Sequence, residues 1–348
     1  MKALLLSEPR GTLPLCDAPD PICPPDGVVV ELRACGVCRS DHHAWVGADP
    51  DVEMPHIMGH ELAGIVAEVG TRVTRFAVGD RVTAPFILAC GTCDDCTGGD
   101  ATVCNHQEVI GFTVWGAFAE AVAVPRADFN LVKLPDALPF DIAAGMGCRV
   151  TTSWRALTTR GGLQPGEWLA IHGCGGVGLS AVLIAKALGA QVVAVDVSDE
   201  ALAIAKALGA DACVNARDGA AGDAVRAVTN GGAHVSLDAL GITATFDASL
   251  RSLRKTGRHV QIGMPVGDHA SPHLPLLELV YARQLTLHGT RGIAATGFVP
   301  LLDLMDSGAL DIAPLVTRRI ALSETHSVLS EMDGAQPPGV AVITDFTA

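Results

Sequence analysis

The stretch GEWLAIHGCGGVGLSAVLIAKALGAQVVAVDV, residues 166–197, decides the fold class. Its pattern predicts a short apolar strand, a glycine-rich turn, a helix that closes on Gly189 and a second strand. The alternation continues downstream, with a helix predicted at 199–210 and strands at 212–216, 234–240, 257–264 and 285–290. Strands that alternate with helices indicate an α/β fold with a doubly wound parallel sheet.

The glycine-rich turn fits the G-x-G-x-x-G pattern of dinucleotide-binding sites, because a strand precedes it and a helix follows. Its glycines let the backbone approach a pyrophosphate, and the helix N-terminus offers free N–H groups. Asp196 ends the next strand, where a carboxylate accepts hydrogen bonds from a ribose and repels a 2′-phosphate, which favours NAD over NADP. The predicted cofactor-binding residues are Gly173, Gly175, Gly176, Val177, Gly178 and Asp196. The alternative is a tight turn that binds no phosphate.

The length and the net charge of the chain limit the classes of function that it can have. A chain of 348 residues fits two domains. Its net charge is −14, and no basic cluster is visible along the sequence, which argues against nucleic acid or an anionic membrane as a partner. No signal peptide or membrane span is predicted, so we expect a cytoplasmic protein. In that reducing compartment its eleven cysteines are expected to be metal ligands or core residues rather than disulfides.

The first ~150 residues show short alternating runs between Gly and Pro, which predict antiparallel strands. Within them, CGTCDDCTGGDATVC, residues 90–104, places four thiols in one loop: Cys90, Cys93, Cys96 and Cys104. Four closely spaced thiolates can enclose one tetrahedral ion and exclude substrate from it, which predicts a structural zinc. An iron–sulfur cluster is the alternative, and a C-x-x-C redox pair is disfavoured in a Gly/Asp loop.

Several motifs in a consistent order resemble one family over nearly the whole length. They are GVCRSDHHAW, GHE, VGDRV, CGTCDDC, GFTVWGAFAEAVAVP, GCGGVG, GGAHVSLDALG and IGMPVG. The chain resembles the zinc-dependent medium-chain alcohol dehydrogenases, and among them the microbial tetrameric type. The resemblance implies a mainly β, distorted-barrel (GroES-like) catalytic domain at 1–149 and 290–348, which carries both zincs. It implies a Rossmann NAD-binding domain at 150–289, and a homotetramer, with a dimer as the alternative.

The resemblance also assigns a catalytic zinc to Cys38, His60 and Cys148, with the fourth position open to water or substrate. Glu61 follows the ligand histidine and is expected to exchange onto the metal. Asp41 is expected to orient the ligands. The resemblance thus implies two zinc ions per chain, one catalytic and one structural, together with NAD.

The implied mechanism is reversible hydride transfer. Ser40 takes the proton of the substrate alcohol, His43 returns it to solvent, and the alkoxide gives a hydride to nicotinamide C4. The resemblance places Arg39 at the cofactor pyrophosphate and Thr152 at the nicotinamide.

For the substrate pocket the resemblance suggests Phe86, Trp45 and Trp115, with plain core packing as the alternative for both tryptophans. His42 is interpreted as an ordinary surface or loop residue. Arg149, directly after the third ligand, is bulkier than the family usually has there, and the sequence names no partner for it.

The predicted activity is oxidation of primary or secondary alcohols to aldehydes or ketones, or the reverse reaction, with NAD. The alternative is a related dehydrogenase of polyols, threonine or formaldehyde. A zinc-less, NADP-binding quinone-reductase-like protein is disfavoured by Cys38, His60, Cys148 and Asp196.

Overall fold

A computed structural model describes residues 1–334 and 339–347 and divides into two compact units. The first, here the β unit, comprises Met1–Thr151, Gly292–Leu302 and Val316–Ala348. The second, here the nucleotide-fold unit, comprises Thr152–Arg291 and Asp303–Leu315. The grouping of residues 303–315 with the nucleotide-fold unit differs from the predicted division, which assigned 290–348 to one domain.

The nucleotide-fold unit is built on one parallel sheet in the order β12-β11-β10-β13-β14-β15. The strands are β10 (Trp168–His172), β11 (Gln191–Asp196), β12 (Ala212–Asn215), β13 (Ala233–Asp238), β14 (Leu253–Gln261) and β15 (Thr286–Gly289). The order reverses beside β10, which is the arrangement of a dinucleotide-binding sheet. The predicted doubly wound sheet is therefore confirmed, although β14 begins four residues before the predicted strand at 257.

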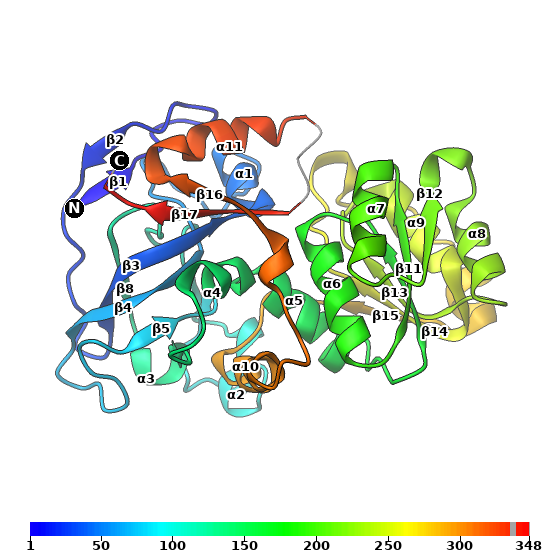
Figure 1. Ribbon diagram of the computed structural model, residues 1–348, viewed down its shortest axis with the longest axis horizontal. Coiled ribbons are helices and arrows are strands. Elements are labelled where there is room, and N and C mark those ends of the chain that lie inside the picture. Colours follow the sequence, from blue (N-terminus) through cyan, green and yellow to red (C-terminus); the bar gives the residue numbers. More distant parts are fainter. Residues whose placement is uncertain (335–338, 348) are drawn as a thin grey trace. The chain divides into compact units, whose positions relative to one another are not determined.

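Helices cover both faces of this sheet, with α6 and α7 on one side and α8 and α9 on the other (Figure 1). They are α6 (Gly176–Ala187), α7 (Asp199–Ala207), α8 (Ala221–Val228) and α9 (Thr243–Ser252). The Ser198 hydroxyl starts α7 by accepting a hydrogen bond from the Ala201 N–H at 3.3 Å. Gly189 and Gly209 follow α6 and α7 with φ of 76° and 109°, which a residue with a side chain adopts only with strain.

The β unit is mainly antiparallel, as predicted. Its main sheet has the order β16-β17-β3-β4-β5-β9, with β8 pairing to β3. These strands are β3 (Val28–Val37), β4 (Glu61–Val69), β5 (Arg81–Thr83), β8 (Ala121–Val124), β9 (Val132–Lys133), β16 (Val316–Ala321) and β17 (Val340–Asp345). Two small sheets pair β1 (Lys2–Leu4) with β2 (Leu15–Asp17) and β6 (Ile87–Leu88) with β7 (Glu108–Val109).

Short helices connect these strands. They are α1 (Arg39–Trp45), α2 (Asp94–Thr97), α3 (Ala127–Asn130), α4 (Phe140–Met146) and α11 (Thr325–Glu331), while α5 (Arg149–Arg155) and α10 (Phe298–Asp306) each continue from one unit into the other. Fully buried apolar side chains, among them Leu62 and Phe118, form the core beneath β3 and β4. Among the described residues, every helix is too short or too polar to cross a bilayer.

Two buried histidines lie within the parallel sheet, His172 at the end of β10, directly before the glycine-rich turn, and His259 in β14. The His172 Nε2 lies 3.3 Å from the Ser252 hydroxyl, and the His259 Nδ1 lies 3.0 Å from the Ser249 hydroxyl. Burial lowers the pKa of His172 to about 3 and that of His259 to about 4. Both rings are therefore neutral in the folded protein at neutral pH.

These histidines predict acid sensitivity of the nucleotide-fold unit. Because their folded pKa values lie below the unfolded value of about 6.5, the unfolded chain binds protons first as the pH falls. Stability is fully present above about pH 6.5 and falls by about 1.4 kcal/mol per pH unit per histidine below it. His172→Asn should flatten this slope in urea unfolding measured between pH 7.5 and 5.

The exposed His273 supplies the matched control. His273→Asn should keep the wild-type pH slope. An unchanged slope in His172→Asn would show that the buried ring does not control acid unfolding.

Candidate active site and metal centres

Three distant segments of the β unit meet at one buried point. Cys38 follows the end of β3, His60 precedes β4, and Cys148 lies between α4 and α5. The pairing of Gly36 in β3 with Glu61 in β4 brings the first two together. The ligand atoms of Cys38, His60, Glu61 and Cys148 all lie within 4.8 Å of one another.

Asp41 orients two of these ligands from the first turn of α1. Its Oδ2 accepts a hydrogen bond from the Cys38 backbone N–H at 2.8 Å, and its Oδ1 lies 2.8 Å from the His60 Nδ1. The Nδ1 proton of His60 is thereby directed to Asp41, which leaves the Nε2 lone pair free. That Nε2 is buried and has no hydrogen-bond partner among the described residues.

A zinc ion fits this set of donors. A buried nitrogen without a partner costs free energy unless a cation or donor meets it, and two thiolates with one imidazole are a zinc donor set. A hydrogen bond from Cys148, followed by the charge of Arg149, lowers the pKa of Cys38 well below its ordinary value despite burial. Cys38 is thus favoured as the thiolate that a metal requires.

Glu61 and Arg149 form a buried pair beside the ligands. The Arg149 Nη2 lies 3.7 Å from the Glu61 Oε2 and also donates to the Val37 carbonyl. These are the partners that the sequence could not name. Burial raises the pKa of Glu61 to about 8, although the charge of Arg149 opposes this. Gly36 makes room for the carboxylate, since a Cβ there would overlap the Glu61 Oε2.

The predicted proton-relay residues lie on α1. The Ser40 hydroxyl is 3.9 Å from the Cys38 Sγ. His43 is half-buried, burial lowers its pKa, and its Nδ1 has no partner in the described part of the chain. His43 is therefore a neutral base at neutral pH, able to accept a proton.

Two other residues of α1, Arg39 and His42, form hydrogen bonds with residues that follow α11. The Arg39 Nη1 donates to the Met332 carbonyl, so at least part of its guanidinium is bound within the β unit. The His42 Nε2 lies 2.9 Å from the Asp333 Oδ1, and His42 is buried. The interpretation of His42 as a surface residue was wrong, because the sequence does not show that α11 packs against α1.

Aromatic side chains surround the ligand histidine. The rings of Phe86 and Phe112 have centroids 5.6 Å and 5.2 Å from that of His60. Phe112 was not singled out from the sequence, although it lies within the motif GFTVWGAFAEAVAVP. Phe112 and the predicted Trp115 also line a cavity of about 510 Å³, together with Asp51, Glu53 and His56.

Trp45 is not among the residues that line this cavity. It is buried in the core, its indole N–H donates to the Gly11 carbonyl at 2.8 Å, and its ring packs edge-on against His326. Its position corresponds to the core-packing alternative rather than to a pocket wall.

The four-cysteine loop has the geometry of a single-ion site. The Cys93 Sγ lies 3.5 Å from that of Cys96 and 3.8 Å from that of Cys104, and Cys90 lies 3.8 Å from Cys96. Ligands about 2.3 Å from one tetrahedral ion lie about 3.8 Å apart, whereas bonded disulfide sulfurs are about 2.05 Å apart. The Thr92 backbone N–H helps to lower the pKa of Cys90 to about 5, which favours a thiolate.

The glycine-rich turn in the nucleotide-fold unit connects β10 to α6. A Cβ at Gly178 would overlap the Gly173 carbonyl oxygen, so close packing requires this glycine. The Asp196 carboxylate accepts hydrogen bonds from the backbone N–H groups of Cys174 at 2.7 Å and Ser198 at 2.9 Å. Gly175, Gly176 and Val177 form the start of α6, where free N–H groups face an incoming anion.

Thr152 lies in the second turn of α5 and is the first residue of the nucleotide-fold unit. Its hydroxyl is buried and lacks a hydrogen-bond partner among the described residues.

Comparison with known proteins identifies both units. Residues 24–136 match the family model of the alcohol dehydrogenase GroES-like domain, and residues 176–307 match that of zinc-binding dehydrogenases. An alcohol dehydrogenase of Geobacillus stearothermophilus is 40% identical over 76% of this chain and 78% of its own length. A sorbitol dehydrogenase of Bacillus subtilis is 31% identical over 94% of this chain and 92% of its own.

A solved structure described as an NAD-dependent alcohol dehydrogenase superposes with a TM-score of 0.88 at 30% identity, covering 99% of both chains. The cysteine and histidine sites, the GroES-like and Rossmann folds and these similarities lead to one conclusion. The chain belongs to the zinc-dependent medium-chain alcohol dehydrogenase family.

Proposed function

We propose that this protein is an NAD-dependent zinc alcohol dehydrogenase that interconverts small primary or secondary alcohols with aldehydes or ketones. The observation that carries this proposal is the buried set of Cys38, His60 and Cys148, in which the His60 Nε2 has no partner among the described residues. Such a set holds zinc through three protein ligands and leaves a fourth position for substrate.

When bound, zinc acts as a Lewis acid that lowers the pKa of an alcohol, and NAD accepts the hydride. The chain's own residues supply the proton path. Ser40 lies next to the Cys38 Sγ and would relay the hydroxyl proton, accepting it as it passes its own onward, and neutral His43 on the same helix is the base that takes up the proton and returns it to solvent. Asp41 fixes the ring of His60, and Phe86 and Phe112 exclude water from one side of it.

The cofactor proposal rests on the glycine-rich turn and Asp196. The Asp196 carboxylate already accepts two backbone hydrogen bonds and retains lone pairs for ribose hydroxyls. Its negative charge disfavours a 2′-phosphate, so we propose NAD rather than NADP. Arg39 and Thr152 are proposed to contact the cofactor, although Arg39 must share its guanidinium with the Met332 carbonyl.

A second zinc is proposed for Cys90, Cys93, Cys96 and Cys104, where four thiolates leave no position for a substrate. Its role is structural, because it would connect the two ends of a loop whose helices are each four residues long or shorter.

Polyol oxidation is the second candidate. Carboxylates of Asp51 and Glu53 line the cavity that Phe112 shares, and carboxylates accept hydrogen bonds from additional hydroxyl groups. The similarity to a sorbitol dehydrogenase supports the same candidate.

Activity of the purified protein tests the proposal. We expect NADH formation with ethanol, propan-2-ol or benzyl alcohol, and a much slower reaction with NADP. His60→Ala should reduce kcat/KM by more than about a hundredfold, because Lewis-acid stabilisation of the reacting oxygen amounts to several kcal/mol.

His273→Ala, at an exposed histidine, is the control and should keep full activity. Activity only with sorbitol would favour the polyol candidate. A His60→Ala variant as active as the wild type would contradict the zinc mechanism.

Metal analysis tests the loop site. Cys93→Ser should lower the zinc content from about two ions per chain to about one and decrease the thermal stability, since a structural zinc contributes directly to folding. Cys213→Ser, which changes an exposed thiol of the other unit, should leave both values unchanged. An unaltered zinc content in Cys93→Ser would show that the loop binds no ion.

A further inference from the structure

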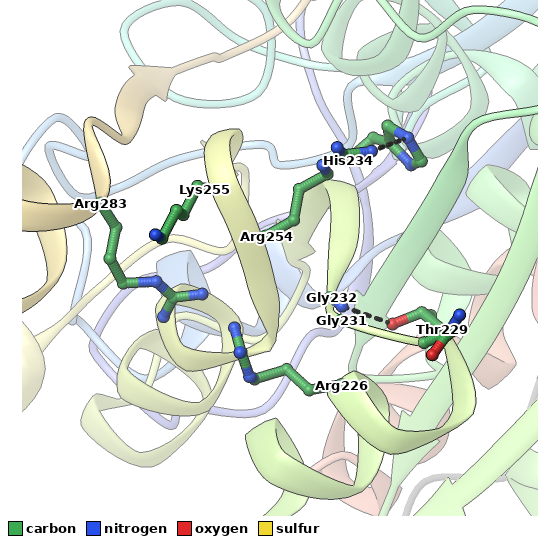
Figure 2. A pocket seen from close by; sticks show the side chains of 9 residues that line it. Arg226, Thr229, Gly231, Gly232, His234, Arg254, Lys255 and Arg283 are labelled. Atoms are coloured by element: carbon green, nitrogen blue, oxygen red, sulfur yellow. Dashed lines mark hydrogen bonds between the residues drawn. The ribbon is translucent and has the colours of Figure 1, made fainter.

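A cavity of about 580 Å³ in the nucleotide-fold unit is lined by basic side chains. Figure 2 shows the guanidinium groups of Arg226 and Arg283 turned toward each other, with the Lys255 ammonium beside them. Arg254 and His234 complete the basic lining. These residues come from four separate segments of the sequence, which the fold brings together.

The cavity lies near the amino ends of the parallel strands, whereas the glycine-rich turn lies at their carboxyl ends. His234 lies near the start of β13, and Arg254 and Lys255 lie near the start of β14. The glycine-rich turn instead follows the carboxyl end of β10. Cofactors of doubly wound sheets bind at the carboxyl ends of the strands, so this cavity is a separate feature.

The positive charge in the cavity is not neutralised by its own lining. The Arg226 Nη1 donates to the Leu253 carbonyl at 3.0 Å, and the Arg283 Nη2 donates to the same oxygen. Among the described residues no carboxylate lines the cavity, and the nearby Glu278 is paired with Arg251 at 2.9 Å. Burial and then the charge of Arg226 lower the pKa of Arg283, which reflects this crowding of cations.

His234 and Arg254 place two ring and guanidinium nitrogens close together at the same cavity. The Trp168 backbone N–H donates to the His234 Nδ1 at 3.0 Å, so a neutral ring carries its proton on Nε2. That Nε2 lies 2.7 Å from the Arg254 Nη1, which is also a donor. Two N–H donors therefore lie close together at the cavity, where one anion can accept hydrogen bonds from both.

We propose that this cavity is a binding site for a multivalent oxyanion, namely a phosphate ion or the phosphate group of a small metabolite. Three cationic side chains that converge without a carboxylate match the charge and the acceptor atoms of such a ligand. The chain carries a net charge of −14, so a general attraction for anions does not account for binding here.

Calorimetric titration of the full chain with inorganic phosphate, pyrophosphate and glycerol 3-phosphate, at constant ionic strength, tests the proposal. We expect saturable binding of at least one probe. The double variant Arg226→Gln/Arg283→Gln should weaken it by more than roughly tenfold, because each charge-assisted hydrogen bond contributes appreciably to affinity. Preference for glycerol 3-phosphate over inorganic phosphate would identify a phosphate monoester as the ligand, and equal affinity would identify the free ion.

Two further variants make the result decisive. Lys255→Gln alters an exposed side chain, so it should weaken binding without affecting thermal unfolding. Arg217→Gln removes an exposed cation that follows the carboxyl end of β12. This variant should bind the phosphate probes with the affinity of the wild type. Binding at the glycine-rich turn would persist in the double variant, so equal affinities in that variant and the wild type would overturn the proposal. Absence of saturable binding by all three probes would also overturn it.

Discussion

The constraint on which the β unit depends is the burial of metal-ligand atoms, among them a histidine nitrogen with no partner in the described part of the chain, which a bound cation would satisfy. Asp41 occupies the Nδ1 of His60 and the backbone N–H of Cys38, and this leaves the His60 Nε2 directed at two thiols. Pairing of β3 with β4 fixes this arrangement, because Gly36 lies opposite Glu61 in the register. The sheet therefore positions the candidate metal centre, and a metal bound there would compensate the polar atoms that the sheet buries.

The same physical argument distinguishes the two candidate centres. In the loop at residues 90–104, four thiols approach at distances suited to one tetrahedral ion, and sulfur would fill all four of its ligand positions. At Cys38, His60 and Cys148, three ligands leave one position open, and Glu61 is held beside them by Arg149. A closed site suits structural support, and an open site suits chemistry.

Local patterns could be predicted from the sequence, whereas contacts between distant segments could not. The glycine-rich turn and the cysteine loop depend on spacing within one segment, so their elements and geometry agree with the structure. Arg149 lacked a partner in the sequence because Glu61 and Val37 lie 88 and 112 residues before it. The basic cavity is not visible along the sequence for the same reason, since residues 226, 254, 255 and 283 meet only after the sheet forms.

X-ray absorption at the zinc edge of the purified protein tests the central claim most directly. The structure provides six cysteine sulfurs for two ions, four in the loop and two beside His60. The average zinc should therefore have three sulfur ligands at about 2.3 Å and about one nitrogen or oxygen ligand at about 2.0–2.1 Å. A first coordination sphere of sulfur alone would contradict metal binding at His60, and one dominated by nitrogen and oxygen would contradict both centres.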